Sequence, residues 1–488
     1  MPAPAIPPSP LTAAAISNTG GALTAYAHEL PAGLGWNHTL LPLNLRSFWQ
    51  ASGLRTGTCG LTAKQVFARF STACDAPQRT FYVKRTGSDS ANGLTWATAV
   101  ASIWKAIELR NAFPTETARI NVDAAINNGL YPRGNGLSNN GTPVLPVFDT
   151  AFVSYYGKVR TGTFEMALTF AVDATHTNTY SVARANVDRV LDLSRPLATG
   201  GYFELTNVAT AAACNMRPDS WALVSGTLYV NRLDGAQPVT SGNNPNTLVN
   251  LSLNLNNYSG TPVNLYFGGE NSGDGFEFFG QAVFNYNARP VTPKAHIFEG
   301  CTFNYGGGLT SGYASRGLTV ESLDGLAACF NCSGTGNATD TFNLHYANAG
   351  AAGGKLYFYS ENCSAFDHGR GSGTSCNGLT LHEDVIAVDL CGRYFNGRGG
   401  TVSNVNASKH FLAATHVEGD VGDRGSGGPN APMAIRAGDT SQLWTDMVSV
   451  NMPSGSIGFY TTTGAAIRGR REITSPGGRT GNGTFGTW

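Results

Sequence analysis

Four acidic residues recur along the chain at a spacing that could bring carboxylates together. Glu270, Glu299, Glu361 and Asp389 each stand two positions before a serine or cysteine that ends a similar short phrase. If the phrases stack, Glu270 and Glu299 lie on consecutive coils about 5 Å apart, as do Glu361 and Asp389. Glu299 and Glu361 then lie two coils, or about 10 Å, apart. Carboxylates about 5–5.5 Å apart serve retaining glycoside hydrolysis, and those about 6.5–9.5 Å apart serve the inverting reaction. The four acids are therefore candidate catalytic residues.

Two other interpretations of these acids stay open. Stacked like charges raise one pKa, as a general acid requires, but the acids could instead hydrogen-bond turn amides at a coil corner and face solvent. A lyase would need clustered carboxylates for calcium and a lysine or arginine base. Lys355 and Arg370 lie near the acids in sequence, but no tight acidic cluster does. Hydrolysis is therefore favoured over elimination.

Aromatic and polar side chains nearby are candidates for binding a sugar. Tyr266, Tyr357 and Tyr359 fall on the outward parity of their strands, on the face of the acids. Flat rings there could stack on sugars, or equally on rings of neighbouring coils or protomers.

A second polar cluster flanks a glycine-rich loop at residues 369–378. A loop held by a rigid scaffold often carries binding residues, and the alternative is a turn with solvated charges. The cluster consists of Asp367, His368, Arg370, His382, Glu383 and Asp384. Asp367, Arg370, His382 and Glu383 join the three tyrosines as candidate substrate-binding residues.

A cysteine repeat indicates the elements that position these residues. Cys301, Cys332, Cys363 and Cys391 are separated by 31, 31 and 28 residues, and Ser272 holds the same place 29 residues before Cys301. Such a period indicates one structural unit stacked on itself. Strand-like alternation at residues 356–361, without room for a long helix in any interval, predicts an all-β parallel β-helix with coils of roughly 22–31 residues. The cysteines would form a buried ladder.

Asparagine residues mark the expected turns of this coil. Asn271, Asn331 and Asn362 each stand one place before the ladder position, and the chain contains 61 glycines. Both residue types tolerate the positive φ that sharp turns require. Turn geometry is thus the favoured role of this asparagine column, with ligand contact as the alternative.

Composition and cysteine usage exclude several classes of protein. The net charge is zero and the pI is about 7.1, without the basic stripe of a nucleic-acid binder. No run of 18 apolar residues predicts a membrane span, and the first basic residue, Arg46, comes too late for a signal peptide. Nine cysteines, four of them in a ladder, argue against a disulfide framework. Cys329 and Cys332 resemble half a zinc site without its second pair, so no metal or other cofactor is expected.

The chain divides into four unequal parts. Residues 1–78 start with a proline-rich arm and continue as a small module with little core of its own, which predicts dependence on a partner or oligomer. Residues 79–113 predict an opening strand and a helix with Val100, Ile103, Trp104 and Ile107 on one face. Residues 114–470 predict the β-helix, and residues 471–488 a glycine-rich tail.

The opening stretch carries a family resemblance. Residues 81–107 contain Tyr-Val, Gly-Ser-Asp-Ser-Ala-Asn-Gly, Ala-Thr-Ala and Ile-Trp-Lys-Ala-Ile, a pattern similar to the first segment of right-handed parallel β-helix proteins of the pectate-lyase superfamily. In that family the helix covers the open end of the first coil, where an exposed sheet edge would otherwise pair with other chains. The phrase at residues 271–276, Asn-Ser-Gly-Asp-Gly-Phe, resembles a turn in phage-borne β-helix spikes, and residues 378–384 are similar.

The resemblance to a spike or fibre of a tailed phage, or of a phage-like particle such as a gene transfer agent, implies several further properties. Residues 1–78 would attach to other proteins of the particle, and the β-helix would face cell-surface polysaccharide. The spike would be a homotrimer on the particle surface, made in the bacterial cytoplasm without a signal peptide.

Two functions remain open at this point. A non-catalytic spike that binds capsule or lipopolysaccharide needs only a groove with rings and polar groups. A polysaccharide depolymerase needs two carboxylates that face one cleft, so whether the chain is an enzyme stays undecided. A secreted pectin-type lyase is disfavoured, because a signal peptide is lacking and the N-terminal module is extra.

Overall fold

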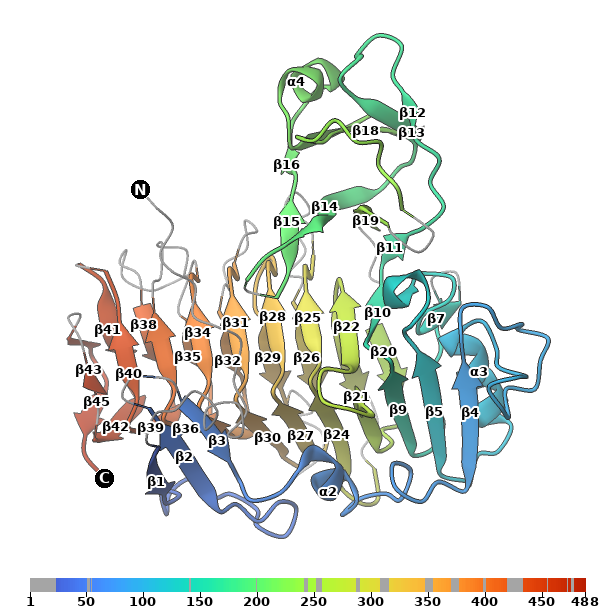
Figure 1. The fold of residues 1–488 in the computed structure, drawn as a ribbon. Helices are drawn as coiled ribbons and strands as arrows, with labels where there is room; N and C mark the ends of the chain where they lie inside the picture. The colour runs from blue at the N-terminus through green and yellow to red at the C-terminus, as the bar shows by residue number, and fades with distance from the viewer. Residues whose placement is uncertain are drawn as a thin grey trace.

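The computed structural model shows three long parallel sheets wound into a coil (Figure 1). It describes residues 23–488 except 51, 52, 54, 140, 141, 199, 241–244, 252–256, 287–289, 308–315, 347–353, 370–376, 398–400, 419–432, 454, 472 and 475–477. Each complete coil contributes one strand to each sheet in turn, as β24, β25 and β26 do. The all-β parallel β-helix predicted from the cysteine repeat is confirmed.

The strands of the three sheets are short and in register from coil to coil. The twelve-stranded sheet contains β4 (Arg79–Val83), β5 (Ala118–Asp123), β9 (Thr150–Tyr155), β21 (Leu265–Gly269), β24 (Lys294–Glu299), β27 (Gly325–Phe330), β30 (Leu356–Glu361), β33 (Val385–Leu390), β36 (Lys409–Ala413), β39 (Gln442–Asp446), β42 (Ala466–Arg470) and β45 (Thr484–Gly486). The ten-stranded sheet contains β6 (Leu130–Tyr131), β10 (Lys158–Gly162), β22 (Gly275–Phe279), β25 (Thr302–Asn304), β28 (Ser333–Thr335), β31 (Ser364–Phe366), β34 (Arg393–Phe395), β37 (His416–Glu418), β40 (Ser449–Asn451) and β43 (Ile473–Thr474). The nine-stranded sheet contains β20 (Asn257–Gly260), β23 (Ala282–Tyr286), β26 (Leu318–Glu321), β29 (Phe342–His345), β32 (Leu379–Leu381), β35 (Val402–Asn404), β38 (Met433–Ala437), β41 (Ile457–Thr461) and β44 (Arg479–Gly481).

The cysteine ladder exists for three of its four predicted members. Cys301, Cys332 and Cys363 are fully buried in the core inside the coil. The Sγ of each donates to a backbone carbonyl of the preceding coil, as Cys332 does to Phe298 at 3.4 Å. The described cysteines form no disulfide. Small apolar thiols thus fill a tight inner corner, as expected.

The register of the ladder differs from the prediction at both ends. Glu361 pairs with Leu390, so Cys391 lies beside Asn362 and packs outside the coil. Cys391 has φ +57°, like Asn331 and Asn362 at +53° and +55°, and it continues the left-handed turn column. At the other end the ladder place belongs to Phe276, because a five-residue loop at 270–274 carries Ser272 away from the coil.

Helix α3 (Ile103–Asn111) covers the open end of the first coil, as the opening segment predicts (Figure 1). Val100, Ile103 and Ile107 are buried in the main core. Trp104 is only half-buried, and its indole donates to the Gly134 carbonyl at 2.8 Å. Covering the terminal coil protects its apolar interior and unpaired edge.

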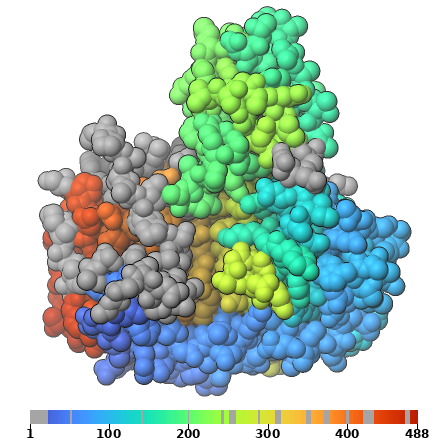
Figure 2. All heavy atoms as spheres, viewed as in Figure 1, coloured from blue at the N-terminus to red at the C-terminus, as the bar shows by residue number. Residues whose placement is uncertain are grey.

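A unit of mainly antiparallel strands interrupts the β-helix between β10 and β20 and projects from it (Figures 1 and 2). One sheet contains β11 (Phe164–Glu165), β14 (Val187–Pro196), β15 (Tyr202–Glu204) and β19 (Thr247–Leu251); the other contains β12 (Ala171–Val172), β13 (Tyr180–Ala183), β16 (Thr206–Asn207), β17 (Ser220–Val224) and β18 (Thr227–Asn231), beside α4 (Ala211–Met216). This insertion has a core of its own around Val190, Trp221 and Leu228. The predicted β-helix of residues 114–470 therefore does not run uninterrupted.

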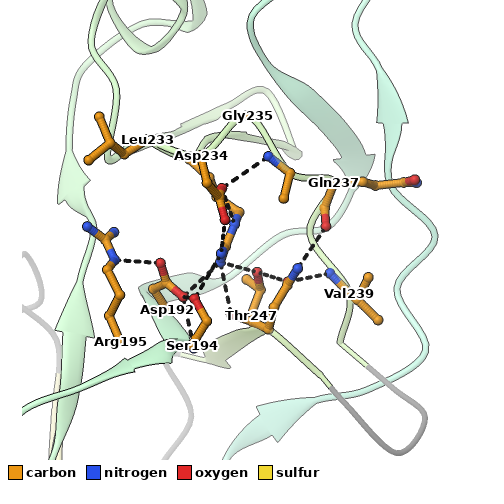
Figure 3. Close-up of polar contacts among 12 residues, drawn as sticks. Asp192, Ser194, Arg195, Leu233, Asp234, Gly235, Gln237, Val239 and Thr247 are labelled. Carbon is orange, nitrogen blue, oxygen red and sulfur yellow. Dashed lines mark hydrogen bonds and ion pairs between the residues drawn. The ribbon is translucent and has the colours of Figure 1, made fainter.

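A buried arginine ties the two sheets of the insertion together. The Arg232 guanidinium, on a residue only 3% exposed, lies 2.9 Å from a carboxylate oxygen of Asp192 and of Asp234. It also donates to Ser194, at 3.1 Å, and to Thr247, at 3.3 Å. Figure 3 shows that Asp192, Ser194, Asp234 and Thr247 lie close together, where these contacts meet. Buried charges need such complete pairing.

The N-terminal module lies along the outer face of the twelve-stranded sheet. It consists of the antiparallel strands β1 (Thr24–His28), β2 (Leu45–Trp49) and β3 (Arg55–Thr58), followed by α2 (Ala63–Phe67). Its buried side chains form one cluster with outward residues of the sheet from Ala151 to Trp444. The partner that so small a module needs is thus this sheet of the same chain. Its role in particle attachment stays a prediction.

The glycine-rich tail also differs from its prediction. Residues 473–486 supply β43, β44 and β45, which extend all three sheets. The Trp488 indole packs edge-on against Phe411, with ring centroids 5.5 Å apart. The end of the chain is therefore part of the last coil. Among the described residues, no helix is long and apolar enough to cross a membrane.

Candidate functional site

A groove of about 620 Å³ lies where the twelve-stranded and ten-stranded sheets meet. Its floor is the outer face of the ten-stranded sheet, and its walls come from α2, the insertion and the loop at 270–274. Figure 2 shows this surface hollowed between the N-terminal module and the insertion. We call it the corner groove; it is lined by Thr62, Lys64, Lys158, Ala198, Gly200, Gly269, Glu270, Asn271, Ser272, Gly273, Asp274, Glu299, Gly300, Thr302, Asn331, Ser333, Ser364 and Phe366.

A second hollow of about 280 Å³ adjoins the corner groove. It lies beside α2, and Glu299 and Glu361 are among the residues that line it. Thr62, Glu299 and Asn331 line both spaces. We call it the side hollow. A capping box between Thr62 and Gln65 starts α2 here, which places Thr62 and Lys64 at the rim.

Glu270 lines the corner groove but is not stacked on Glu299. Phe267 pairs with Phe298, which brings Gly268, not Glu270, opposite Glu299. Glu270 starts the 270–274 loop instead, where its carboxylate lies 2.5 Å from Arg119 Nη2 and 3.7 Å from Lys64 Nζ. Two cations thus neutralise the predicted catalytic acid.

Glu299 and Glu361 lie two coils apart, as predicted. Glu299 pairs with Phe330, and Phe330 with Glu361, which corresponds to about 10 Å at normal strand spacing. Glu299 is half-buried and accepts a hydrogen bond from the Tyr266 hydroxyl. These two carboxyls are the pair that the structure brings to one space.

Glu361 is nearly buried beneath the N-terminal module. Its Oε2 accepts from the Cys59 backbone N–H and from the Tyr359 hydroxyl, each at 2.7 Å. Burial raises the pKa of this carboxyl to about 7, although both hydrogen bonds oppose the shift. A carboxyl that holds its proton near neutral pH can act as a general acid.

Asp389 is inside the coil, which contradicts its prediction as a surface acid. It pairs with Ser360, and Leu390 takes the outward place after Glu361. The carboxylate accepts from the hydroxyls of Ser360 and Thr415, each at 2.6 Å, and burial raises its pKa. Counting from Cys391 as a ladder residue caused this one-residue error, and one residue reverses the face of a strand.

The three candidate tyrosines point outward but are covered. Tyr266 and Tyr359 are fully buried, and the ring of Tyr266 packs against Phe67 of α2 at 5.6 Å. Tyr357 is half-buried against Trp36, with ring centroids 5.6 Å apart. The N-terminal module therefore uses these rings as its packing surface, and they do not form a sugar-stacking platform in this arrangement.

The second predicted cluster is not gathered in one place. Asp367 follows β31 and is half-buried, whereas His382 and Glu383 follow β32 at the next corner of the coil. His368 is fully buried. Arg370 lies outside the described residues. His382 and Glu383 instead meet His345, a residue that the sequence analysis did not single out.

Several lining residues could not be chosen from the repeat. Lys64 and Thr62 come from the N-terminal module, and Lys158 from a coil that precedes the insertion. Asp274 belongs to the turn phrase at 271–276, which was the available indication of a loop here. Its carboxylate holds the loop by accepting from the Gly157 N–H at 2.7 Å.

Comparisons with known proteins found likenesses of structure alone. No family model and no curated protein matches the chain. The structure of XylC in complex with xylose has a TM-score of 0.42 at 9% identity, over 81% of this chain and 70% of that one. A glycoside hydrolase has 0.44 at 9%, over 84% and 96%. The Gp54 tailspike of Acinetobacter baumannii bacteriophage AP22, in complex with A. baumannii capsular saccharide, has 0.22 at 11%, over 79% and 66%. Any function for this chain must therefore be argued from its own residues.

Proposed function

We propose that the corner groove binds an extended polysaccharide. The observation that carries the proposal is a row of hydroxyls on its floor. Thr302 pairs with Ser333, and Ser333 with Ser364, so one hydroxyl per coil follows the long axis at about 4.8 Å intervals. Among the described residues, the hydroxyls of Thr302 and Ser364 are shielded and have no hydrogen-bond partner.

Such hydroxyls favour a ligand that supplies many hydrogen-bonding groups. Shielded polar atoms are normally paired in proteins, and leaving one unpaired costs about 1–3 kcal/mol. A glycan offers hydroxyls along its whole length and can satisfy several coils at once. Both charges line the groove, with Lys64 and Lys158 as cations and Glu270, Asp274 and Glu299 as acids, so the groove does not require a strongly charged ligand.

We further propose that polysaccharide binding in the corner groove serves adsorption to a cell surface. A spike or fibre of a phage-like particle would use the groove to hold capsule or lipopolysaccharide. Residues 1–78 would join it to other proteins of the particle, and three chains would associate at the particle surface. The support for this is the long parallel β-helix together with the resemblance of residues 271–276 to a turn in such spikes.

Surface plasmon resonance against purified bacterial capsules and lipopolysaccharides tests the binding. At least one polysaccharide should bind, and Ser333→Trp, which fills the groove, should weaken that binding at least tenfold. Asn451→Trp is the matched control, because Asn451 is exposed on the same sheet outside the groove. Unchanged binding by Ser333→Trp contradicts the proposed site.

A depolymerase is the second candidate, and the raised pKa of Glu361 favours it. Glu361 would give its proton to the leaving glycosidic oxygen, while Glu299 takes a proton from the attacking water. Their two-coil separation is close to that of inverting enzymes. New reducing ends from a bound polysaccharide, lost in both Glu361→Gln and Glu299→Gln, would establish catalysis. Binding without any release of oligosaccharide would exclude it.

A further inference from the structure

Two histidines stack at the corner between the nine-stranded and twelve-stranded sheets, away from the corner groove. His345 ends β29, and His382 directly follows β32 on the next coil. Because Leu344 pairs with Leu381, the two histidines occupy the same place on consecutive coils. Their rings are 3.8 Å apart and within 10° of parallel.

Glu383 completes a three-residue cluster with these rings. Its Oε2 lies 3.4 Å from His345 Nδ1. One potential ligand atom from each of the three residues lies within 4.8 Å of the other two. The side chains of His345 and Glu383 are 15% and 34% exposed, so the cluster is shielded and still open to solvent.

Each member has a shielded polar atom without a hydrogen-bond partner. These atoms are His345 Nε2, His382 Nε2 and Glu383 Oε2. Other contacts hold the groups from behind, because the Asn406 side chain hydrogen-bonds His382 and the Tyr346 backbone hydrogen-bonds Glu383. Two imidazole nitrogens without hydrogen-bond partners, beside a carboxylate and with outer partners on His382 and Glu383, match the usual composition of a metal site.

We propose that His345, His382 and Glu383 bind one divalent transition-metal ion. Two imidazoles and one carboxylate suit zinc and its neighbours in the first transition row, whereas calcium and magnesium prefer oxygen ligands. A point equidistant from three atoms at most 4.8 Å apart lies within about 2.8 Å of each. The zinc–nitrogen distance of about 2.1 Å then requires shifts of up to about 0.7 Å and a turn of the stacked rings that points both nitrogen lone pairs at the ion. Three protein ligands leave a coordination position for water.

The ion would join two consecutive coils that the chain connects only through a long segment. His345 and His382 are 37 residues apart, so a shared ion closes this loop and stabilises the folded state by binding it alone. Arg316 opposes the cation, since its charge acts on His382. Arg316→Met is accordingly expected to tighten binding.

Calorimetric titration of the untagged full chain with Zn²⁺, after removal of metal with a chelator, tests the proposal. One equivalent should bind, and the melting temperature should rise. His345→Gln and His382→Gln should each lower the affinity at least tenfold and abolish the rise. Calcium at the same concentrations should have no effect. X-ray absorption of the zinc form should show two imidazoles and one carboxylate.

His416→Gln is the matched control. His416 also lies beside a glutamate, 3.0 Å from Glu418, but it has no third ligand among the described residues. The His416→Gln variant should bind zinc with the same affinity as the wild type. Equal zinc binding by wild type and by the double variant His345→Gln/His382→Gln overturns the proposal. Matching melting curves in chelator show that the variants fold.

Discussion

His28 Nδ1 lies 2.9 Å from Asp446 Oδ2, and the two residues are 418 positions apart in the chain. Both side chains are fully buried. Arg470 and Arg471 also donate to Asp446, and Ser47 contacts the other nitrogen of His28 at 2.8 Å. The first strand of the N-terminal module is therefore fastened to one of the last coils.

Asp446→Asn is expected to loosen the N-terminal module. The hydrogen bonds from His28 and the two arginines hold the pKa of Asp446 well below its usual range, and breaking a buried ion pair costs about 3–5 kcal/mol. Because the folded pKa is lowered, this stability is present above the ordinary aspartate pKa of about 4 and is lost as pH falls towards the folded value. Urea unfolding from pH 7 to pH 3 measures it. Glu29→Gln, at an 88% exposed side chain, should change nothing.

The raised pKa of Glu361 leads us to expect that docking of the N-terminal module weakens as pH rises, which is opposite to the dependence expected from Asp446. Its pKa rises from 4.5 to about 7 on folding, so its contribution is fully present below pH 4.5 and is lost as pH rises through about 7. The loss amounts to about 3 kcal/mol at most. The hydrogen-exchange protection factors of residues 55–67, which correct for the intrinsic rise of exchange with pH, should therefore fall between pH 6 and pH 8.5. Glu361→Gln should remove this dependence, and its persistence would assign the effect to another group.

Asn331 and Asn362 offer a matched pair at the turn column. Both have left-handed φ, at +53° and +55°, so replacement by alanine costs each about 1 kcal/mol in backbone strain. Asn362 also accepts from the Gly57 N–H at 2.6 Å and donates to the Gly57 carbonyl at 3.0 Å. Asn362→Ala should therefore lose about 1–3 kcal/mol more than Asn331→Ala in denaturant unfolding. Equal losses would mean that these contacts add no stability.

Arg232→Met is expected to unfold the insertion selectively. It leaves Asp192 buried without its guanidinium partner, at a cost of about 3–5 kcal/mol. Limited proteolysis should cut within residues 163–251, while the β-helix stays intact. Arg217→Met, at an exposed residue of the same unit, is the control. Cleavage spread over the whole chain would show that the insertion and the β-helix unfold together.

The fold was predictable because stacking repeats a local pattern. The phrases around Cys301, Cys332 and Cys363 were sufficient to identify strand, turn and inner corner. Assigning strand positions by counting from the cysteines failed where the repeat length changed. The assignment was wrong by one residue at Cys391, and the five-residue loop at 270–274 displaces Glu270. One residue decides which face a strand side chain takes, so Asp389 was assigned to the wrong side.

The repeat could not predict that the N-terminal module covers the twelve-stranded sheet, or which residues form the walls of the corner groove. Contacts such as Phe67 with Tyr266 join segments without any common pattern. The outward parity of Tyr266 and Tyr359 was correct, but parity does not tell whether water or another part of the chain lies outside. His345 and His382 likewise meet only once the lengths of the intervening coils are known.

The position of the N-terminal module constrains the order in which the chain can fold. A stack of coils ordinarily adds or loses its units at the ends, with each coil stabilised by its neighbours. Here residues 24–67 leave the ribosome before any of the coils, yet the surface they cover extends to Trp444 and Asp446. The strand β1 therefore cannot complete its contact with Asp446 until nearly all coils exist. Once docked, the module joins early and late coils, so that opening of the coil that carries Asp446 also breaks the contact of β1.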